Sequence, residues 1–163
     1  NNAGWNRPQH VLEVDDDTLD AMLDLNVRSV FVAAQAAARR MVADGRGGSI
    51  INMSSQMGHV GGPLRSVYCA TKWGVEGMTR AMAIELAEHA VRVNTVAPTF
   101  VSTPLADQFL ADPEFSDFVL GSIPLGRLAT VDEVANAVVY LAAPGSASVT
   151  GTSLVVDGGW TAK

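Results

Sequence analysis

The stretch Ser49-Ile50-Ile51-Asn52-Met53 decides the fold that this sequence predicts. It is a short apolar run with a glycine-rich break before it, at residues 44–48, and a loop after it, which is typical of a buried strand. Segments with helical periodicity lie on both sides of it, at residues 19–42 and 67–90. Because strands that alternate with helices form parallel sheets with covered faces, we predict an α/β protein.

The same alternation continues toward the C-terminus. Val91-Arg92-Val93-Asn94-Thr95-Val96-Ala97 is predicted to be a second strand that ends at Pro98, and Ser153-Leu154-Val155-Val156 a last one. Between them, Thr130-Val131-Asp132-Glu133 matches a capping box and starts a helix that should run to about Ala142. These elements predict a doubly wound, Rossmann-type parallel sheet in three α/β/α layers, with right-handed crossovers.

Composition excludes several classes of protein. The chain has 163 residues, of which 48% are apolar and 17% charged, so one globular domain is expected and long disorder is not. The net charge is −6 and no basic block occurs, which argues against nucleic-acid binding. We also expect no membrane partner, because no apolar run is long enough to span a bilayer. Cys69 is the single cysteine, which fits a reducing, cytoplasmic compartment.

Tyr68-Cys69-Ala70-Thr71-Lys72 places a phenol and an ammonium four residues apart on one face of a predicted helix. A nearby ammonium favours the phenolate, so Lys72 would lower the pKa of Tyr68 and suit it to exchange a proton with a substrate. On its own, such a pair is much more often two ordinary surface neighbours on a helix. Ser55 strengthens the functional interpretation, because it follows a strand at the sheet edge where ligands bind. Alone, Ser55 would be an ordinary loop serine.

With these motifs in place, the sequence resembles the short-chain dehydrogenase/reductase family over essentially its whole length. Six segments occur in the family's order and spacing: Asn1-Asn2-Ala3-Gly4, Leu25-Asn26-Val27, Ile51-Asn52-Met53-Ser54-Ser55, Tyr68-Cys69-Ala70-Thr71-Lys72, Arg92-Val93-Asn94-Thr95-Val96-Ala97-Pro98 and Val155-Val156-Asp157-Gly158-Gly159. The resemblance implies NAD(P)-dependent interconversion of an alcohol and a carbonyl. It makes Tyr68 the general acid/base and Ser55 the group that polarises the substrate oxygen.

The resemblance also assigns the cofactor contacts. Tyr68 and Lys72 would both contact the cofactor, and Lys72 would hydrogen-bond the nicotinamide ribose. Asn26 would hold a water that extends a proton relay from Lys72. The remaining contacts would come from two loops that line the adenosine and nicotinamide sides of NAD or NADP: Asn2, Ala3, Gly4, Pro98, Val101 and Thr103. Thr99 stands where the family usually has glycine.

Residues 104–128 resemble the family's substrate lid. Gln56, His59 and Phe100 lie near the predicted mouth of the site and are expected to face the substrate. His10, His59 and His89 show no metal-ligand spacing, so no metal is predicted. The segments around Gln56 and Trp160 look most like relatives that act on sugars, sugar acids or polyols, and a 3-oxoacyl thioester reductase is the alternative.

The family's phosphate-binding glycine loop does not occur in residues 1–163. We therefore expect the chain to be the C-terminal two-thirds of a single dinucleotide-binding oxidoreductase domain, without its first strands. The choice between NAD and NADP would depend on that other part. The resemblance implies a homo-oligomer, a dimer or tetramer, through the two long helices. A non-catalytic oligomerising or binding module is the competing hypothesis, because residues 33–38 are rich in alanine and suit helix association.

Overall fold

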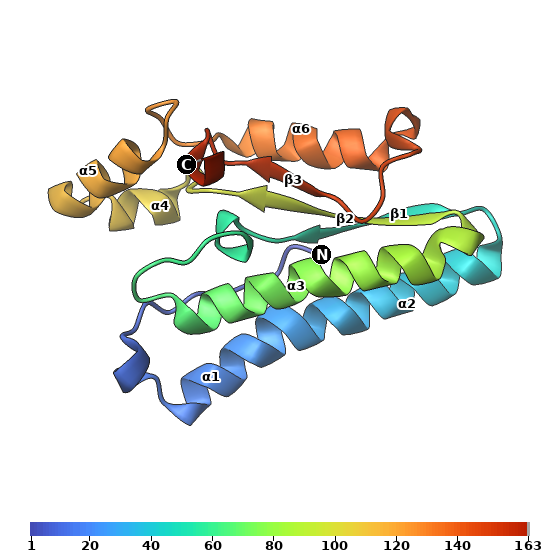
Figure 1. Ribbon diagram of the computed structural model, residues 1–163, viewed down its shortest axis with the longest axis horizontal. Helices are drawn as coiled ribbons and strands as arrows, with labels where there is room; N and C mark the ends of the chain where they lie inside the picture. Colours follow the sequence, from blue (N-terminus) through green and yellow to red (C-terminus); the bar gives the residue numbers. More distant parts are fainter. Residues whose placement is uncertain (163) are drawn as a thin grey trace.

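The computed structural model describes residues 1–162, except for the side chain of Leu105. Its sheet has three strands in the order β1-β2-β3, all parallel (Figure 1). They are β1 (Gly48–Met53), β2 (Val91–Pro98) and β3 (Ser153–Val156). The parallel α/β sheet predicted from the sequence is therefore confirmed, and each strand lies within one residue of its predicted place.

The helices cover both faces of this sheet, which gives the predicted three layers. α2 and α3 lie against one face and α6 lies against the other (Figure 1). The helices are α1 (Asp16–Leu23), α2 (Ser29–Asp44), α3 (Ser66–Leu86), α4 (Pro104–Phe109), α5 (Pro113–Ser122) and α6 (Val131–Ala142).

Each face of the sheet has its own apolar core. On the α2/α3 side, Ile50 and Val93 of the strands pack with small helix residues such as Ala34 and Ala83. On the other side, Val96 packs with Ala137 and Leu141 of α6. Alternate residues of a strand point to opposite faces, so Val93 and Val96 of β2 belong to opposite cores.

Local signals in the sequence set the helix boundaries. The Asp15 side chain accepts a hydrogen bond from the Thr18 N–H and caps α1, and α2 ends at Gly45 with a φ of 65°. The capping box at Thr130 and Glu133 forms as predicted, and α6 runs to Ala142. These contacts lie within a few residues of each other, so they could be predicted without tertiary information.

One helix departs from the prediction. The periodicity predicts a single helix over residues 19–42, but a π-helical turn, Asp24–Arg28, separates α1 from α2. Such a turn admits one extra residue and is frequent at functional sites. Here it contains Asn26, whose side chain is fully buried.

The carboxyl ends of β1 and β2 form one edge of the sheet, where the chain continues into the loops that contain Ser55 and Thr99.

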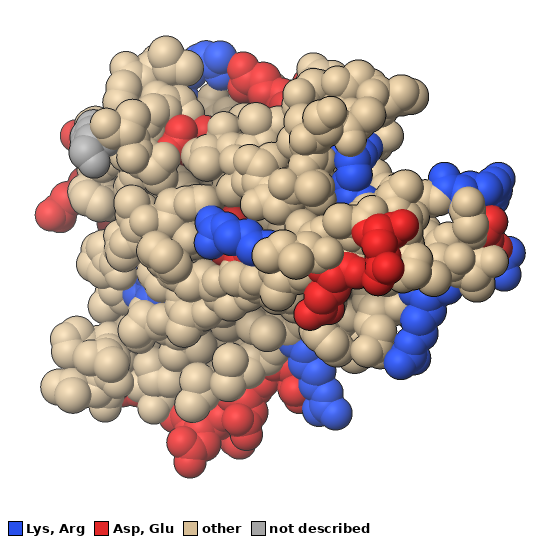
Figure 2. All heavy atoms as spheres, turned by 45° about the vertical axis from the view of Figure 1, so that its right-hand side comes forward, with Lys and Arg blue, Asp and Glu red and all other residues tan. Residues whose placement is uncertain are grey.

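On the face shown in Figure 2, acidic and basic side chains are scattered over a mostly uncharged surface. Among residues 1–162, no helix combines the length and the apolar character that a membrane crossing requires.

Candidate active site

Ser55, Tyr68 and Lys72 meet at the carboxyl end of β1. Ser55 is buried and caps a short 3-10 turn, Gln56–Gly58, where its Oγ accepts a hydrogen bond from the Met57 N–H at 3.2 Å. Tyr68 and Lys72 lie on the first turns of α3, and the Lys72 Nζ lies 5.5 Å from the centroid of the Tyr68 ring. The structure thus brings together the three residues that the sequence pattern selected.

The environment of Tyr68 acts on its ionisation in both directions. Burial raises the pKa of the phenol above its usual value, whereas a side-chain hydrogen bond with Ser55 and the positive charge of Arg65 act to lower it. No sequence pattern marks Arg65 as a site residue. It lies three residues before Tyr68, a spacing that places both on one side of the helix start.

Lys72 is almost fully buried, and burial lowers the pKa of its ammonium from 10.5 to about 8, against the opposing charge of Glu76. Its Nζ donates one hydrogen bond, to the Met53 carbonyl at 2.9 Å. An ammonium has three N–H donors, so within the described residues two of them have no acceptor. They are available to a ligand on this side of α3.

Asn26 joins the N-terminal segment to the site. Its Oδ1 accepts a hydrogen bond from the Trp5 N–H at 2.8 Å, and its Nδ2 donates to the Trp5 carbonyl at 2.7 Å and to the Thr71 Oγ1 at 3.2 Å. A Cβ placed on Gly4 would lie 3.4 Å from the Asn26 Oδ1 and 3.6 Å from the Lys72 Nζ. The amide therefore fixes the backbone beside Lys72, and Gly4 keeps that approach free of a side chain.

We expect Asn26→Leu to destabilise the fold by about 2 kcal/mol, because both polar groups of the Trp5 backbone lose their partner while the branched shape of the side chain is kept. Chemical denaturation measures this change. Thr71→Val is the matched comparison, because it removes one of the amide's contacts and keeps both bonds to Trp5. An equal or larger loss in Thr71→Val would contradict the assigned role of Asn26.

The segment Asn1–Gly4 runs along the outer edge of β1. The Asn1 amino group donates to the Ile51 carbonyl, and the Met53 N–H donates to the Asn1 carbonyl at 2.8 Å. Asn2, Ala3 and Gly4 follow as exposed residues. They lie beside the end of β1 that leads to Ser55.

The loop after β2 also presents groups at this edge of the sheet. Pro98 ends the strand, and a backbone bridge with Ala129 holds the residues around Val101. Within the described part of the chain, the Val101 N–H donates no hydrogen bond. The Thr103 Oγ1 caps α4 by accepting from the Ala106 N–H, so its hydroxyl hydrogen remains the group it can offer a ligand.

A cavity of about 160 Å³ opens beside Ser55 and Tyr68. Three buried oxygens on its lining residues have no hydrogen-bond partner in the described structure, namely Asn6 Oδ1, Gln56 Oε1 and Thr99 Oγ1. Buried acceptors are costly unless a donor reaches them, so the cavity favours a ligand with hydroxyl groups. Gln56 was expected at this site, whereas no local pattern indicates Asn6.

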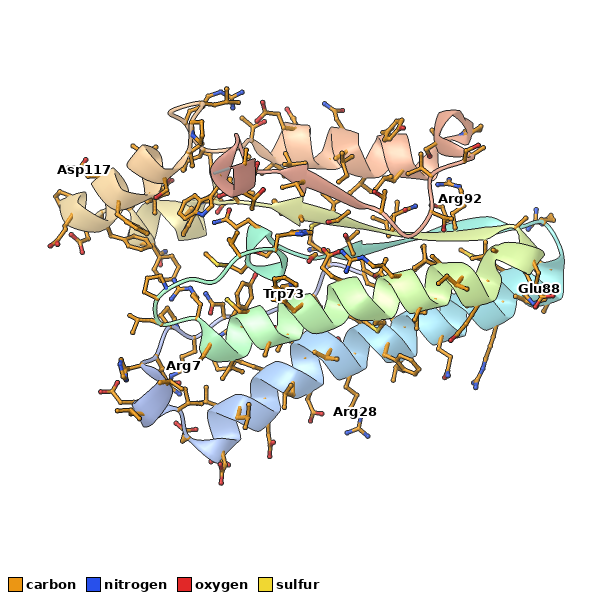
Figure 3. The ribbon with its side chains drawn as sticks, in the orientation of Figure 1. Arg7, Arg28, Trp73, Glu88, Arg92 and Asp117 are labelled. Atoms are coloured by element: carbon orange, nitrogen blue, oxygen red, sulfur yellow. The ribbon has the colours of Figure 1, made fainter. Side chains whose placement is uncertain are left out.

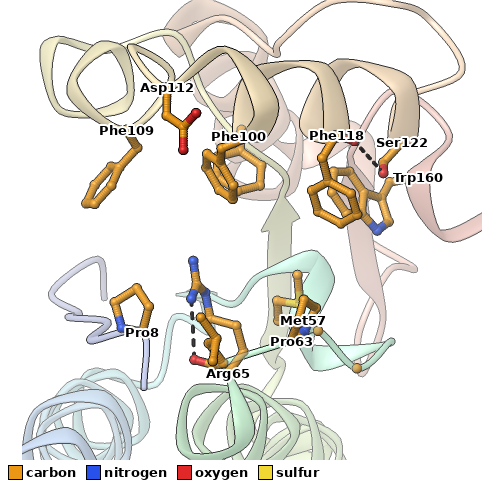
Figure 4. Close-up of a pocket in the computed structure, with 14 residues that line it drawn as sticks. Pro8, Met57, Pro63, Arg65, Phe100, Phe109, Asp112, Phe118, Ser122 and Trp160 are labelled. Atoms are coloured by element: carbon orange, nitrogen blue, oxygen red, sulfur yellow. Dashed lines mark hydrogen bonds between the residues drawn. The ribbon is translucent and has the colours of Figure 1, made fainter. Parts of the chain in front are cut away.

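A second cavity, of about 580 Å³, adjoins the first and shares Met57, Arg65 and Phe100 with it (Figure 4). Its upper wall comes from α4 and α5, the two short helices of the expected lid. Aromatic rings dominate this wall, and they contact one another in a chain: Phe100, Phe115, Phe118 and Trp160. Phe100 lines both cavities, and its contact with a substrate stays a prediction.

His59 takes a different place. Its Nε2 lies 2.9 Å from the Ser153 Oγ and 3.3 Å from the Glu76 Oε1, and it lines neither of the two cavities. Glu76 is buried and also accepts hydrogen bonds from the hydroxyls of Thr95 and Ser153. His59 thus belongs to a polar network that ties α3 to β2 and β3. In residues 1–162, no three metal-ligand side chains cluster.

Comparison with known proteins identifies the family. A family model described as enoyl-(acyl carrier protein) reductase matches residues 1–161. The chain belongs to the short-chain dehydrogenase/reductase family. It is 40% identical, over all of its residues, to 2-dehydro-3-deoxy-D-gluconate 5-dehydrogenase of Escherichia coli, and 40% identical over 99% of them to L-xylulose reductase of Bos taurus. It spans 64% and 66% of the length of these two relatives.

Solved structures of this dehydrogenase family share the fold. A gluconate 5-dehydrogenase from Burkholderia cenocepacia, solved in complex with NADP and tartrate, matches with a TM-score of 0.94 and 35% identity over 99% of this chain and 63% of that one. A protein from Agrobacterium tumefaciens described as a putative 2-deoxy-D-gluconate 3-dehydrogenase, with bound NADP, matches with a TM-score of 0.96 and 34% identity. The match covers 99% of this chain and 65% of that protein.

Proposed function

We propose that this protein interconverts a secondary alcohol and a carbonyl with NAD or NADP as the hydride carrier. The observation that carries the proposal is the meeting of Ser55, Tyr68 and Lys72 beside a cavity at the carboxyl edge of the sheet. The Ser55 hydroxyl supplies a donor that positions the substrate oxygen, and the Tyr68 phenol supplies the proton acceptor. The Lys72 ammonium supplies a cation that favours the phenolate.

In the oxidation direction, the Ser55 hydroxyl holds the oxygen of the substrate alcohol against the Tyr68 phenol. The Tyr68 phenolate takes the hydroxyl proton, and the carbon–oxygen double bond forms as the carbinol hydrogen leaves with its electron pair. The positive charges of Lys72 and Arg65 favour the phenolate that this step needs. In the reduction direction, Tyr68 returns the proton to the carbonyl oxygen.

The residues on this side of α3 fit a nicotinamide cofactor. Two N–H donors of Lys72 are free for ribose hydroxyls, the Val101 N–H is free for a carboxamide oxygen, and Gly4 keeps a close approach open. Pro98, Thr103, Asn2 and Ala3 line the same edge of the sheet. When bound, the nicotinamide supplies the acceptor or donor for the hydride.

We also propose that Asn26 holds the water that connects Lys72 to solvent. The proposal is supported by the distances from Gly4, because the Asn26 Oδ1 and the Lys72 Nζ flank the same position at 3.4 and 3.6 Å from its would-be Cβ. One lone pair of Oδ1 is used by Trp5, which leaves the other for a water.

The proposed substrate is a sugar, sugar acid or polyol. The names of the relatives support this class, and so do the three oxygens of Asn6, Gln56 and Thr99, which need hydroxyl donors. The aromatic cavity favours a second candidate, a 3-oxoacyl thioester with an apolar chain. A (3R)-3-hydroxyacyl-CoA dehydrogenase of Canis lupus familiaris is 40% identical over 96% of this chain.

The assembly of the protein is part of the proposal. We infer that residues 1–163 are the C-terminal two-thirds of one dinucleotide-binding domain, which the share of the relatives' length supports. A homo-oligomer, a dimer or tetramer, is supported by apolar side chains exposed on α2 and α3, among them Phe31 and Ile84. Trp73 of α3 is another, and Figure 3 labels it. The single, unpaired Cys69 supports a cytoplasmic location.

Reduction of NAD or NADP by the full-length protein, measured with a panel of aldonic acids, alditols and 3-hydroxyacyl thioesters, tests the proposed reaction. We expect turnover with at least one member and a strong preference between the sugar-type and thioester substrates. A folded oligomer that binds no dinucleotide and turns over no alcohol would instead favour the non-catalytic module.

A further inference from the structure

We propose that Arg65 binds the carboxylate of the substrate, and that the sugar-type substrate of this protein is therefore an acid. This inference deepens the proposed function and rests on it. It begins from the place of Arg65, whose side chain lines both the small cavity beside Tyr68 and the large aromatic cavity under the lid. No other charged residue of the described chain lines both.

The guanidinium of Arg65 has little to bind within the protein. It has five N–H donors, and the hydrogen bond that it makes in the described structure goes from Nη1 to the Leu64 carbonyl at 3.3 Å. None of the ion pairs among residues 1–162 includes Arg65. By contrast, Arg127 makes two short bonds to the carboxylate of Glu133, at 2.7 and 3.0 Å.

The surroundings of Arg65 partly remove its guanidinium from water. Figure 4 shows its side chain rising from the lower wall of the cavity toward Phe100, with Pro8 and Pro63 on either side. Burial lowers the pKa of the guanidinium, which reflects this loss of water. An anion that enters between these apolar walls gains a charge-assisted bond in a low-dielectric setting, and a planar guanidinium matches a carboxylate with two parallel N–H donors.

Asp112 is the acidic group that faces Arg65 across the same cavity (Figure 4). Its carboxylate caps α5 by accepting from the Glu114 N–H at 3.1 Å and makes no ion pair with Arg65. The guanidinium therefore stays free for a ligand. The negative charge of Asp112 does not pair with Arg65, but it repels an anionic substrate. The remaining groups that act on Arg65 are the Tyr68 phenol and the Cys69 thiol.

The geometry also orders the substrate. Arg65 precedes Tyr68 by three residues on the same helix start, so a carboxylate held by Arg65 lies near the carbon whose oxygen contacts Tyr68 and Ser55. Hydroxyl groups between the two would reach the oxygens of Asn6, Gln56 and Thr99. This arrangement selects a hydroxy or oxo acid over a neutral polyol of the same length.

The test compares acids with their neutral counterparts in the full-length enzyme. The pairs are D-gluconate with D-glucitol, and 3-hydroxybutyrate with 1,3-butanediol, and kcat/KM is measured for each member. We expect the wild type to prefer an acid, and Arg65→Gln to lower the ratio of acid to neutral kcat/KM by about 30-fold. Arg65→Lys should recover part of the ratio, because it restores the charge without the planar fork.

Two variants serve as controls. Arg46→Gln removes the same charge from an exposed turn and should leave the ratio unchanged. Asp112→Asn keeps the cap of α5 and removes the opposing charge, so it should lower KM for the acid. Binding of D-gluconate, followed through the fluorescence of Trp160 in the cavity wall, gives a readout that needs no turnover.

These outcomes separate the two proposals. If neutral alcohols are oxidised as well as the acids, or if Arg65→Gln leaves the ratio and the binding of D-gluconate unchanged, the role of Arg65 is wrong and the proposed function stands. If the wild type binds acids through Arg65 but oxidises no member of either pair with NAD or NADP, the anion site stands and the proposed reaction is wrong for this substrate class.

Discussion

Tyr68→Phe is expected to lower kcat by about 10²- to 10⁴-fold, the usual contribution of a positioned general acid/base. The phenol oxygen is the atom that exchanges the proton with the substrate, and among the described residues no carboxylate lines the small cavity beside it. The aromatic ring remains, so the packing at the start of α3 is kept. Steady-state rates and a titration with NADPH measure the two effects.

The chain offers a matched control for this variant. Tyr140 is the other tyrosine of the sequence and lies half exposed on α6, away from the cavities. Tyr140→Phe should leave kcat unchanged. We expect the affinity of Tyr68→Phe for NADPH to stay within about 3-fold of the wild type, because the hydroxyl acts on the substrate. A Tyr68→Phe enzyme that keeps its kcat would remove Tyr68 from the mechanism.

Lys72→Met is expected to lower kcat/KM by about 10²-fold or more, because the variant loses both the ribose contact and the cation that favours the phenolate. Lys72 also links the site to stability. Burial lowers the pKa of its ammonium from 10.5 to about 8, so between these pH values the unfolded chain binds the proton more tightly than the folded one.

The sign of this linkage gives a pH test. The free energy of unfolding of the wild type should rise by about 3 kcal/mol, relative to Lys72→Met, as the pH increases from 8 to 10.5. Tyr68 acts in the opposite direction above pH 10, because burial raises the pKa of its phenol. Lys72→Arg should lack the rise, since arginine stays charged. If the difference in the free energy of unfolding between the wild type and Lys72→Met stays constant from pH 8 to 10.5, the ammonium of Lys72 is not buried as described.

The strands and the main helices could be predicted because their signals are local. The apolar run at Ser49–Met53 and the capping box at Thr130 depend on residues within a few positions. The π turn could not be predicted, since the contact that accompanies it joins Asn26 to Trp5, 21 residues away in the sequence. Apolar periodicity alone gives a straight helix there.

In the candidate site, too, some residues could be predicted from the sequence and others depend on the tertiary fold. Ser55, Tyr68 and Lys72 were selected by a pattern of residue types, and the structure brings them together. Asn6 and Arg65 reach the cavities only because the loops before α1 and α3 fold beside each other, with the Gln9 N–H donating to the Leu64 carbonyl at 3.1 Å. His59 shows the converse, because the network of Glu76 and Ser153 draws it away from the cavities.

Transfer of deuterium tests the central claim most directly. The best alcohol substrate is labelled with deuterium at its carbinol carbon, and the reduced cofactor formed by the full-length enzyme is analysed by mass spectrometry. Our account predicts one deuterium in each NADH or NADPH formed, no label when the deuterium comes from the solvent, and loss of the product with Tyr68→Phe. Reduced cofactor without the substrate's deuterium, or oxidation of the alcohol without reduction of NAD or NADP, would contradict it.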